Sequence, residues 1–107
     1  MINYIEEMMK ITGVEKYLVT TTDYTKNPIN IHIEKLNTPI FTAEKQLEII
    51  KMMDGITIKS DCFIVQDLNL VMYFNGKDFT QALAQLTIEL IYLGKLDKNK
   101  VKGILER

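Results

Sequence analysis

Residues 62–74 read CFIVQDLNLVMYF, two apolar runs separated by a short polar segment. Runs of β-branched and aromatic residues of this length are typical of β-strands. Asp67, Leu68 and Asn69 supply turn chemistry between the two runs, so the stretch predicts a β-hairpin. With the turn at these three residues, the expected cross-strand pairs are Gln66 with Leu70, Ile64 with Met72, and Cys62 with Phe74.

Both faces of this predicted hairpin are apolar. In the expected register one face carries Cys62, Ile64, Leu70, Met72 and Phe74, and the other carries Phe63, Val65, Val71 and Tyr73. An antiparallel sheet usually leaves one face in water, so two apolar faces imply cover on both sides. The chain's own helices can supply that cover in a helix–sheet–helix sandwich, or a second polypeptide can cover one face.

The second of these faces is the candidate interaction surface. Its residues are Phe63, Val65, Val71 and Tyr73. Tyr73 suits an interface because its large, rigid ring ends in a polar hydroxyl. The expected partner is a second copy of the chain, giving a homodimer, or a different protein.

Capped amphipathic helices flank the hairpin on both sides. Apolar residues recur at helical spacing after Thr42 and stop before Gly55, which predicts a helix ahead of the hairpin. Asp78 with Gln81 forms a capping pair that opens a helix after the hairpin, and Gly94 ends that helix.

Two more helices are expected near the ends of the chain. Asn3 with Glu6 is a capping pair for a helix that Gly13 ends. Asp97 caps a short last helix, which we expect to fold back on the body.

Strand patterns fill the remaining segments. Residues 14–22 are rich in β-branched and aromatic side chains, and residues 29–34 alternate isoleucine with polar residues. The predicted order is helix, strand, strand, helix, strand, strand, helix, helix. We therefore expect a single α+β domain over residues 1–107, with a mostly antiparallel sheet of about four strands covered by helices.

Composition excludes several classes of protein. The chain has 107 residues, of which 47% are hydrophobic and 25% charged, with a net charge of −1, and this excludes a disordered or collagen-like chain. Its apolar runs are far shorter than the ~20 residues that span a bilayer, so no membrane association is expected. A single cysteine, Cys62, cannot form an internal disulfide, and a cytoplasmic location is expected.

Catalytic and metal-binding patterns are not found. The chain has one histidine, His32, and no serine or cysteine near it in the sequence to complete a nucleophile–base pair. Cys62 lies within an apolar strand pattern, where a free cysteine is usually a small buried hydrophobe. One histidine and one cysteine do not make a zinc site, and the dispersed glycines form no phosphate loop. We expect no enzyme activity, no metal and no cofactor.

An alternative is a binding module for a small ligand or a nucleic acid. Asn30, His32 and Glu34 form the polar face of the predicted strand at residues 29–34 and could contact a ligand. The order helix, three strands, helix after Thr42 is similar to that of double-stranded-RNA-binding domains. That family places a lysine cluster where this chain has only Lys77, so nucleic acid is the less expected partner.

One set of features is spread over half of the chain: the Thr-Pro-Ile-Phe-Thr segment at 38–42, the aromatic hairpin end at residues 73 and 74, Gly76, and the Ala-Leu-Ala start of a helix at 82–84. In these features the chain resembles small bacteriophage proteins called ABA-sandwich domains. The chain departs from the family in having no tryptophan. The resemblance implies no enzymatic activity, a phage or prophage origin, and a host protein as the target. We expect a non-enzymatic interaction protein that binds or inhibits a host protein.

Overall fold

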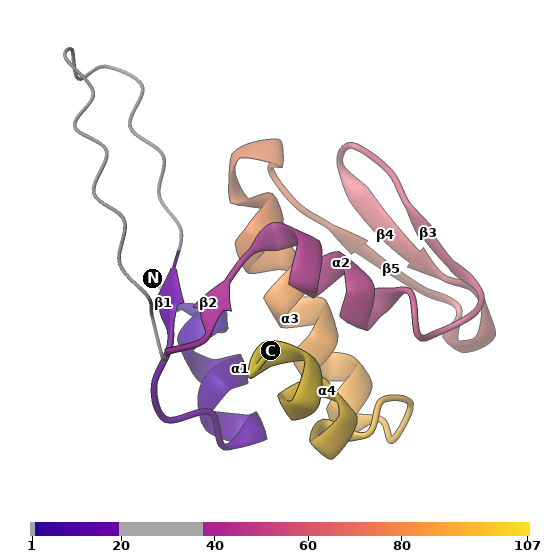
Figure 1. Cartoon of the computed structure of the whole chain (residues 1–107). Helices are drawn as coiled ribbons and strands as arrows, with labels where there is room; N and C mark the ends of the chain where they lie inside the picture. The colour runs from indigo at the N-terminus through magenta and orange to yellow at the C-terminus, as the bar shows by residue number, and fades with distance from the viewer. Residues whose placement is uncertain (1, 20–37) are drawn as a thin grey trace, which may run out of the picture.

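The computed structural model describes residues 2–19 and 38–107. Four helices and five strands lie in these ranges (Figure 1). The helices are α1 (Tyr4–Thr12), α2 (Ala43–Ile50), α3 (Phe79–Tyr92) and α4 (Lys98–Leu105). The strands are β1 (Leu18–Val19), β2 (Ile40–Phe41), β3 (Ile56–Ile58), β4 (Cys62–Val65) and β5 (Leu70–Tyr73). Two short 3-10 turns, η1 (Gln66–Leu68) and η2 (Gly76–Asp78), follow β4 and β5. The fold class is α+β, as expected.

The predicted caps hold three of the four helices. The side chains of Asn3, Thr42 and Asp97 accept hydrogen bonds from backbone N–H groups in the first turns of α1, α2 and α4. These bonds satisfy donors that a helix start otherwise leaves without partners. Gly13 ends α1 in the left-handed conformation, with φ of +81°.

The expected capping pair at the start of α3 is wrong. Asp78 precedes α3 but makes no side-chain capping bond. Gln81 instead turns toward α1: its Oε1 accepts the backbone N–H of Tyr4 at 2.7 Å, and its Nε2 donates to Asn3 Oδ1 at 3.2 Å. The sequence spacing assigned Gln81 to the cap of α3, but its side chain instead binds the start of α1.

The antiparallel sheet has three strands within the described residues, in the order β3-β4-β5. The strand pattern after residue 55 contains two reversals, because the polar segment of residues 59–61 separates β3 from β4. Of the strand expected at residues 14–22, residues 20–22 lie outside the described ranges; within the described part the strand is β1, which pairs in parallel with β2. The strand expected at residues 29–34 lies outside the described residues.

The hairpin register differs from the expected one by a single residue. Cys62 lies opposite Tyr73 and Val65 opposite Leu70. The turn takes four residues instead of three, because Gln66 joins the 3-10 turn and Asn69 closes it in the left-handed conformation, with φ of +49°. A one-residue slip moves every side chain of one strand to the other face.

All four helices lie on the same side of the three-stranded sheet (Figure 1). α1 packs on α3, and α2 and α4 also pack against this helical body. Phe63 links the sheet to the helices: its ring stacks on Phe74 at 4.5 Å between centroids and lies 5.9 Å from the ring of Phe79 in α3. One face of the sheet is therefore part of the core.

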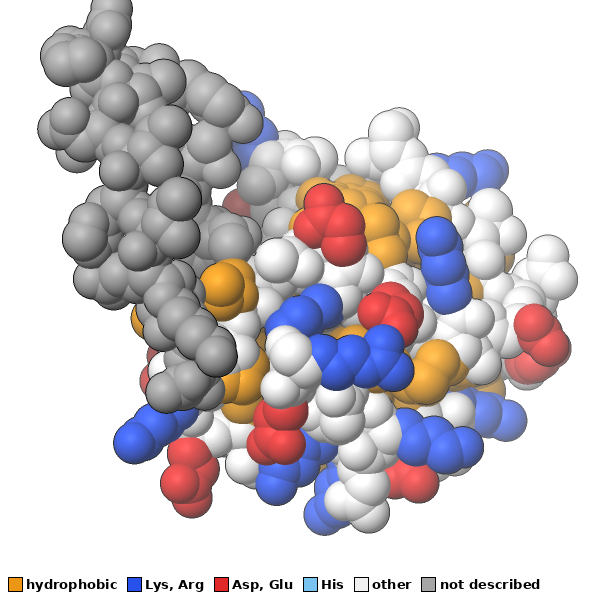
Figure 2. Space-filling model, in the orientation of Figure 1, with side chains coloured by type: hydrophobic (Ala, Val, Ile, Leu, Met, Phe, Trp, Pro, Cys, Tyr) orange, Lys and Arg blue, Asp and Glu red, His pale blue; other side chains and the backbone are white. Residues whose placement is uncertain are grey.

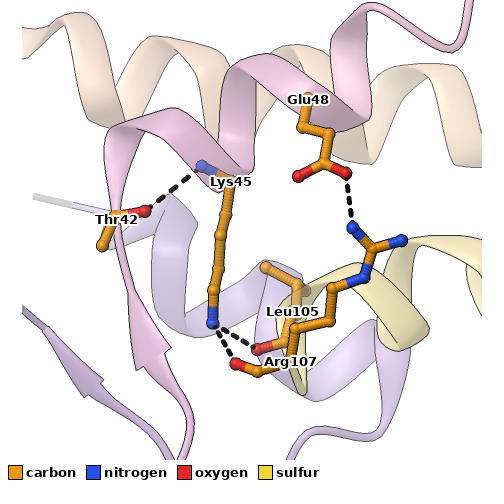
Figure 3. A network of polar contacts seen from close by, with 5 residues as sticks. All are labelled: Thr42, Lys45, Glu48, Leu105 and Arg107. Atoms are coloured by element: carbon orange, nitrogen blue, oxygen red, sulfur yellow. Dashed lines mark hydrogen bonds and ion pairs between the residues drawn. The ribbon is translucent and has the colours of Figure 1, made fainter.

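The last helix folds back on the body, as expected. Val101 and Leu105 are fully or almost fully buried. Figure 3 shows how the chain end is held: Lys45 Nζ of α2 donates to the carbonyl oxygens of Leu105 and Arg107, at 3.4 and 2.6 Å. The guanidinium of Arg107 in turn pairs with Glu48 of α2.

Candidate functional site

The face of the sheet that points away from the helices carries the exposed apolar residues of the hairpin. We call it the outer sheet face; its residues are Thr57, Cys62, Ile64, Val71 and Tyr73, which share one side in the observed register. Tyr73 is 76% exposed and Val71 is 44% exposed. Neither belongs to the hydrophobic core or packs against it. The chain's described helices therefore cover only one of the two apolar faces.

The four candidate interaction residues divide between the two faces. Phe63 and Val65 are buried at 0% and 1% exposure inside the core, so their assignment to an accessible surface is wrong. Val71 and Tyr73 do lie on the outer sheet face. The cause is the register: an extra turn residue moves β4 relative to β5, so that Phe63 pairs with Met72 and not with a residue of the exposed face.

The strand that carries Val71 and Tyr73 is also an edge of the sheet. β5 pairs with β4 on one side, and no strand of the described ranges pairs with its other side. Phe74 N–H donates to Asp61 O at 2.9 Å, so the N–H and C=O groups of alternate residues, Phe74 and Met72, point toward β4. The N–H and C=O groups of Val71 and Tyr73 consequently point away from the sheet. The side chains of these two residues are exposed, and their backbone groups point to the edge that no described strand pairs.

The β5 edge carries neither a charged side chain nor a proline. Residues 70–75 read LVMYFN. Natural edge strands usually carry lysine, proline or a bulge that prevents pairing with another chain. The β5 edge is therefore suited to accept another strand. Sequence reasoning passed over this property, although the absence of charge in residues 70–75 was the available signal.

Cys62 is not equipped to act as a nucleophile. Burial raises the pKa of its thiol, the neighbouring Asp61 carboxylate raises it further, and Lys59 opposes these effects only in part. The thiolate, not the thiol, is the reactive form. Cys62 therefore stays protonated at neutral pH.

The alternative ligand site falls in a part of the chain that the structure does not describe. Asn30, His32 and Glu34 are outside the described residues. Within the described ranges, no three His, Cys, Asp or Glu side chains gather in a way that could hold a metal ion. No helix in these ranges has the length and apolarity needed to cross a bilayer.

Basic side chains do not form a uniform surface on the side of the molecule seen in Figure 2. There, lysine and arginine side chains alternate with aspartate and glutamate. Lys77 is exposed beside Asp78, and Lys102 of α4 pairs with Glu106 at 3.7 Å. Binding of nucleic acid depends on positive charge that phosphates can neutralise, and this mixture offers little of it.

Comparisons with known proteins give no relative for this chain. No family model matches the sequence, and no significant match was found among curated proteins or solved structures. The resemblance to phage ABA-sandwich proteins therefore stays a prediction.

Proposed function

We propose that this protein acts in the cytoplasm by binding another protein and not by catalysis, and that it binds through the outer sheet face and the β5 edge. The observation that carries the proposal is that two properties suited to binding occur together at Val71 and Tyr73. Both residues expose apolar side chains, and both direct backbone hydrogen-bonding groups away from the sheet. Extended partners bind other proteins by adding a strand to such an edge.

A second copy of the chain is the partner that we propose. If a two-fold axis passes beside Met72, Val71 of one copy lies opposite Tyr73 of the other. Both outward N–H groups and both outward C=O groups of each edge then find partners. A shift by two residues would place an edge residue opposite Asn69 or Asn75, beyond the ends of β5. Only the first register gives hydrogen-bond partners within β5 to the outward backbone groups of both Val71 and Tyr73.

Strand pairing at this edge places Val71 of each copy beside Tyr73 of the other on the outer sheet face, without covering that face. Each such cross-strand pair contributes roughly 0.2–1 kcal/mol, and each new backbone hydrogen bond roughly 0.5–1.5 kcal/mol. These gains are set against a cost of at least about 4 kcal/mol for the motion lost on association. We expect a homodimer that dissociates readily on dilution.

The test is analytical sedimentation over a roughly hundredfold range of concentration, since a reversible dimer obeys mass action. The wild-type protein should shift from monomer to dimer, and Val71→Asp and Tyr73→Asp should remain monomeric. Met52→Asp is the matched control, because Met52 is 42% exposed, nearly the same as Val71, but lies just after α2. A wild-type protein that stays monomeric throughout, or aspartate variants that dimerise normally, would contradict the proposal.

We also propose, on the ABA-sandwich resemblance, that the gene is of phage origin and that a host protein is the eventual target. If that target uses the same surface, Tyr73→Asp should lose a partner that both wild-type protein and Met52→Asp retain from a bacterial extract. Retention of the same partners by all three proteins would place the target site elsewhere.

A further inference from the structure

A second exposed apolar surface lies between α1 and α3, and it is built from these two helices and Ile2. It is a groove of about 380 Å³. We call it the α1–α3 groove; it is lined by Ile2, Tyr4, Glu7, Ile11, Gln85, Ile88, Glu89 and Tyr92. A smaller hollow of about 190 Å³ extends it toward the start of α3, where Asp78, Gln81 and Ala82 join the lining.

The groove follows from the way the two helices run side by side. Near their first residues Tyr4 is bonded to Gln81, and near their last turns Ile11 and Tyr92 line the same hollow. The helices therefore run in the same direction. The lining residues recur at intervals of three and four along each helix, which places them on one stripe beside the stripe that faces the core.

Apolar side chains in this groove are left open to solvent. Tyr92 is 71% exposed and Ile2 is 60% exposed, while Tyr4 and Ile11 are half-buried. Contiguous exposed apolar surface of this kind typically marks a binding site. A depression between two helices that run side by side is a common docking site for a third helix.

The charged residues that line the groove favour one kind of binding partner over others. Glu7 and Glu89 lie on the groove, and Asp78 lies on its extension. No lysine or arginine lines either hollow. Lys10 lies outside the lining, and its Nζ is 3.8 Å from Glu7 Oε1 at the surface. Two copies joined groove to groove would bring carboxylates together, which disfavours self-association here and favours a basic partner.

We propose that the α1–α3 groove binds an amphipathic α-helix of another protein, with apolar residues at spacings of three and four and with lysine or arginine on both sides of that stripe. The apolar stripe fills the groove between Tyr4 and Tyr92. The basic side chains reach Glu7 and Glu89. Because α1 has nine residues, the contact spans about 13 Å, or two to three turns of the bound helix. This inference does not depend on the sheet-face proposal.

The test uses fluorescence anisotropy of a labelled synthetic peptide of about four helical turns. The probe carries leucine at helical spacing and lysine on its flanks; one control peptide replaces each lysine by glutamate, and another scrambles the leucine spacing. The full-length protein should bind the first peptide at least roughly tenfold more tightly than either control. Equal binding of all three peptides, or no binding of the first, would overturn the proposal.

Variants of the protein locate the binding site. Tyr92→Ala should weaken binding of the basic peptide roughly tenfold, and Glu7→Lys with Glu89→Lys should reverse the preference toward the acidic peptide. Leu93→Ala is the matched control. Leu93 follows Tyr92 in the sequence and is 52% exposed, but it does not line the groove. Val71→Asp should bind the peptide normally, which separates this site from the sheet face.

Amide chemical shifts provide a readout that does not rely on variants. On adding the basic peptide, the largest changes should fall in α1 and α3. Changes centred on β5, or dimerisation that Tyr92→Ala abolishes without any peptide, would instead assign the groove to another occupant and contradict the proposal.

Discussion

The two faces of the β4–β5 hairpin are built from the same kinds of residue but have different surroundings. Phe63 and Val65 on the inner face are completely or almost completely buried, whereas Val71 and Tyr73 on the outer face are 44% and 76% exposed. On the inner face Phe63 stacks on Phe74, and both rings contact Phe79 of α3. Apolar composition thus indicates that a strand face needs cover, but it does not indicate which molecule supplies that cover.

The largest difference between the faces should appear in stability. Phe63→Ala removes a buried ring that stacks on Phe74 and leaves a cavity, so the free energy of unfolding should fall by about 3–5 kcal/mol. Tyr73→Ala on the outer face should change it by no more than about 0.5 kcal/mol in dilute solution. Urea unfolding of both variants measures the contrast. Similar losses for the two variants would mean that the outer face is covered within one chain.

A substitution in the hairpin turn, whose length decides which face each residue lies on, should have the next largest effect on stability. Asn69 has φ of +49°, a conformation that asparagine tolerates and alanine does not, so Asn69→Ala should destabilise the protein by about 1–2 kcal/mol. Asn69→Gly should be close to neutral. Asp67→Ala, in the same exposed turn, serves as the control in urea unfolding. If Asn69→Ala matched this control, the left-handed turn would not set the register.

A substitution on the outer face should separate stability from association. Val71→Asp should leave the free energy of unfolding of the dilute protein within about 0.5 kcal/mol of wild type. The wild-type melting temperature should rise with protein concentration, because dimerisation stabilises the folded state by mass action. For Val71→Asp the melting temperature should stay constant. Calorimetry at several concentrations checks this, and parallel curves for the two proteins would contradict it.

The smallest expected effect concerns Cys62, which lies on the outer side of β4 but is buried. Its folded-state pKa is raised, by burial first and then by Asp61, so the folded protein holds the thiol proton more tightly than the unfolded chain. The stabilisation is present below the ordinary thiol pKa and is lost as pH rises through the folded pKa. The stability difference between wild type and Cys62→Ala should therefore shrink in alkaline solution. A difference that grows with pH would contradict this sign.

Local signals predicted much of the fold. Asn3, Thr42 and Asp97 cap helices as the sequence indicates, since each capping bond joins residues only two or three apart. Gln81 shows the limit of this reasoning. It has the spacing of a capping residue, but its amide is used by the start of α1, a tertiary contact that no local pattern contains.

The candidate site was harder to predict, because it depends on one residue of turn length. The sequence pattern predicts one candidate interaction face that carries Phe63, Val65, Val71 and Tyr73, but Phe63 and Val65 belong to the opposite, buried face. The alternation of side chains has a period of two, so a turn of four residues instead of three reverses the assignment for a whole strand. The sequence did not predict the α1–α3 groove. Its residues lie beside the stripe of each helix that faces the core, and they form one surface only when α1 and α3 pack side by side.

Amide hydrogen exchange at the β5 edge tests the central claim most directly. In dilute solution the N–H groups of Val71 and Tyr73 should exchange rapidly, while those of Met72 and Phe74, which face β4, should be protected. As the concentration rises, protection of Val71 and Tyr73 should increase until it approaches that of their neighbours. Protection of both amides in dilute solution, or rapid exchange at every concentration, would contradict the assignment of this edge and face to a second polypeptide.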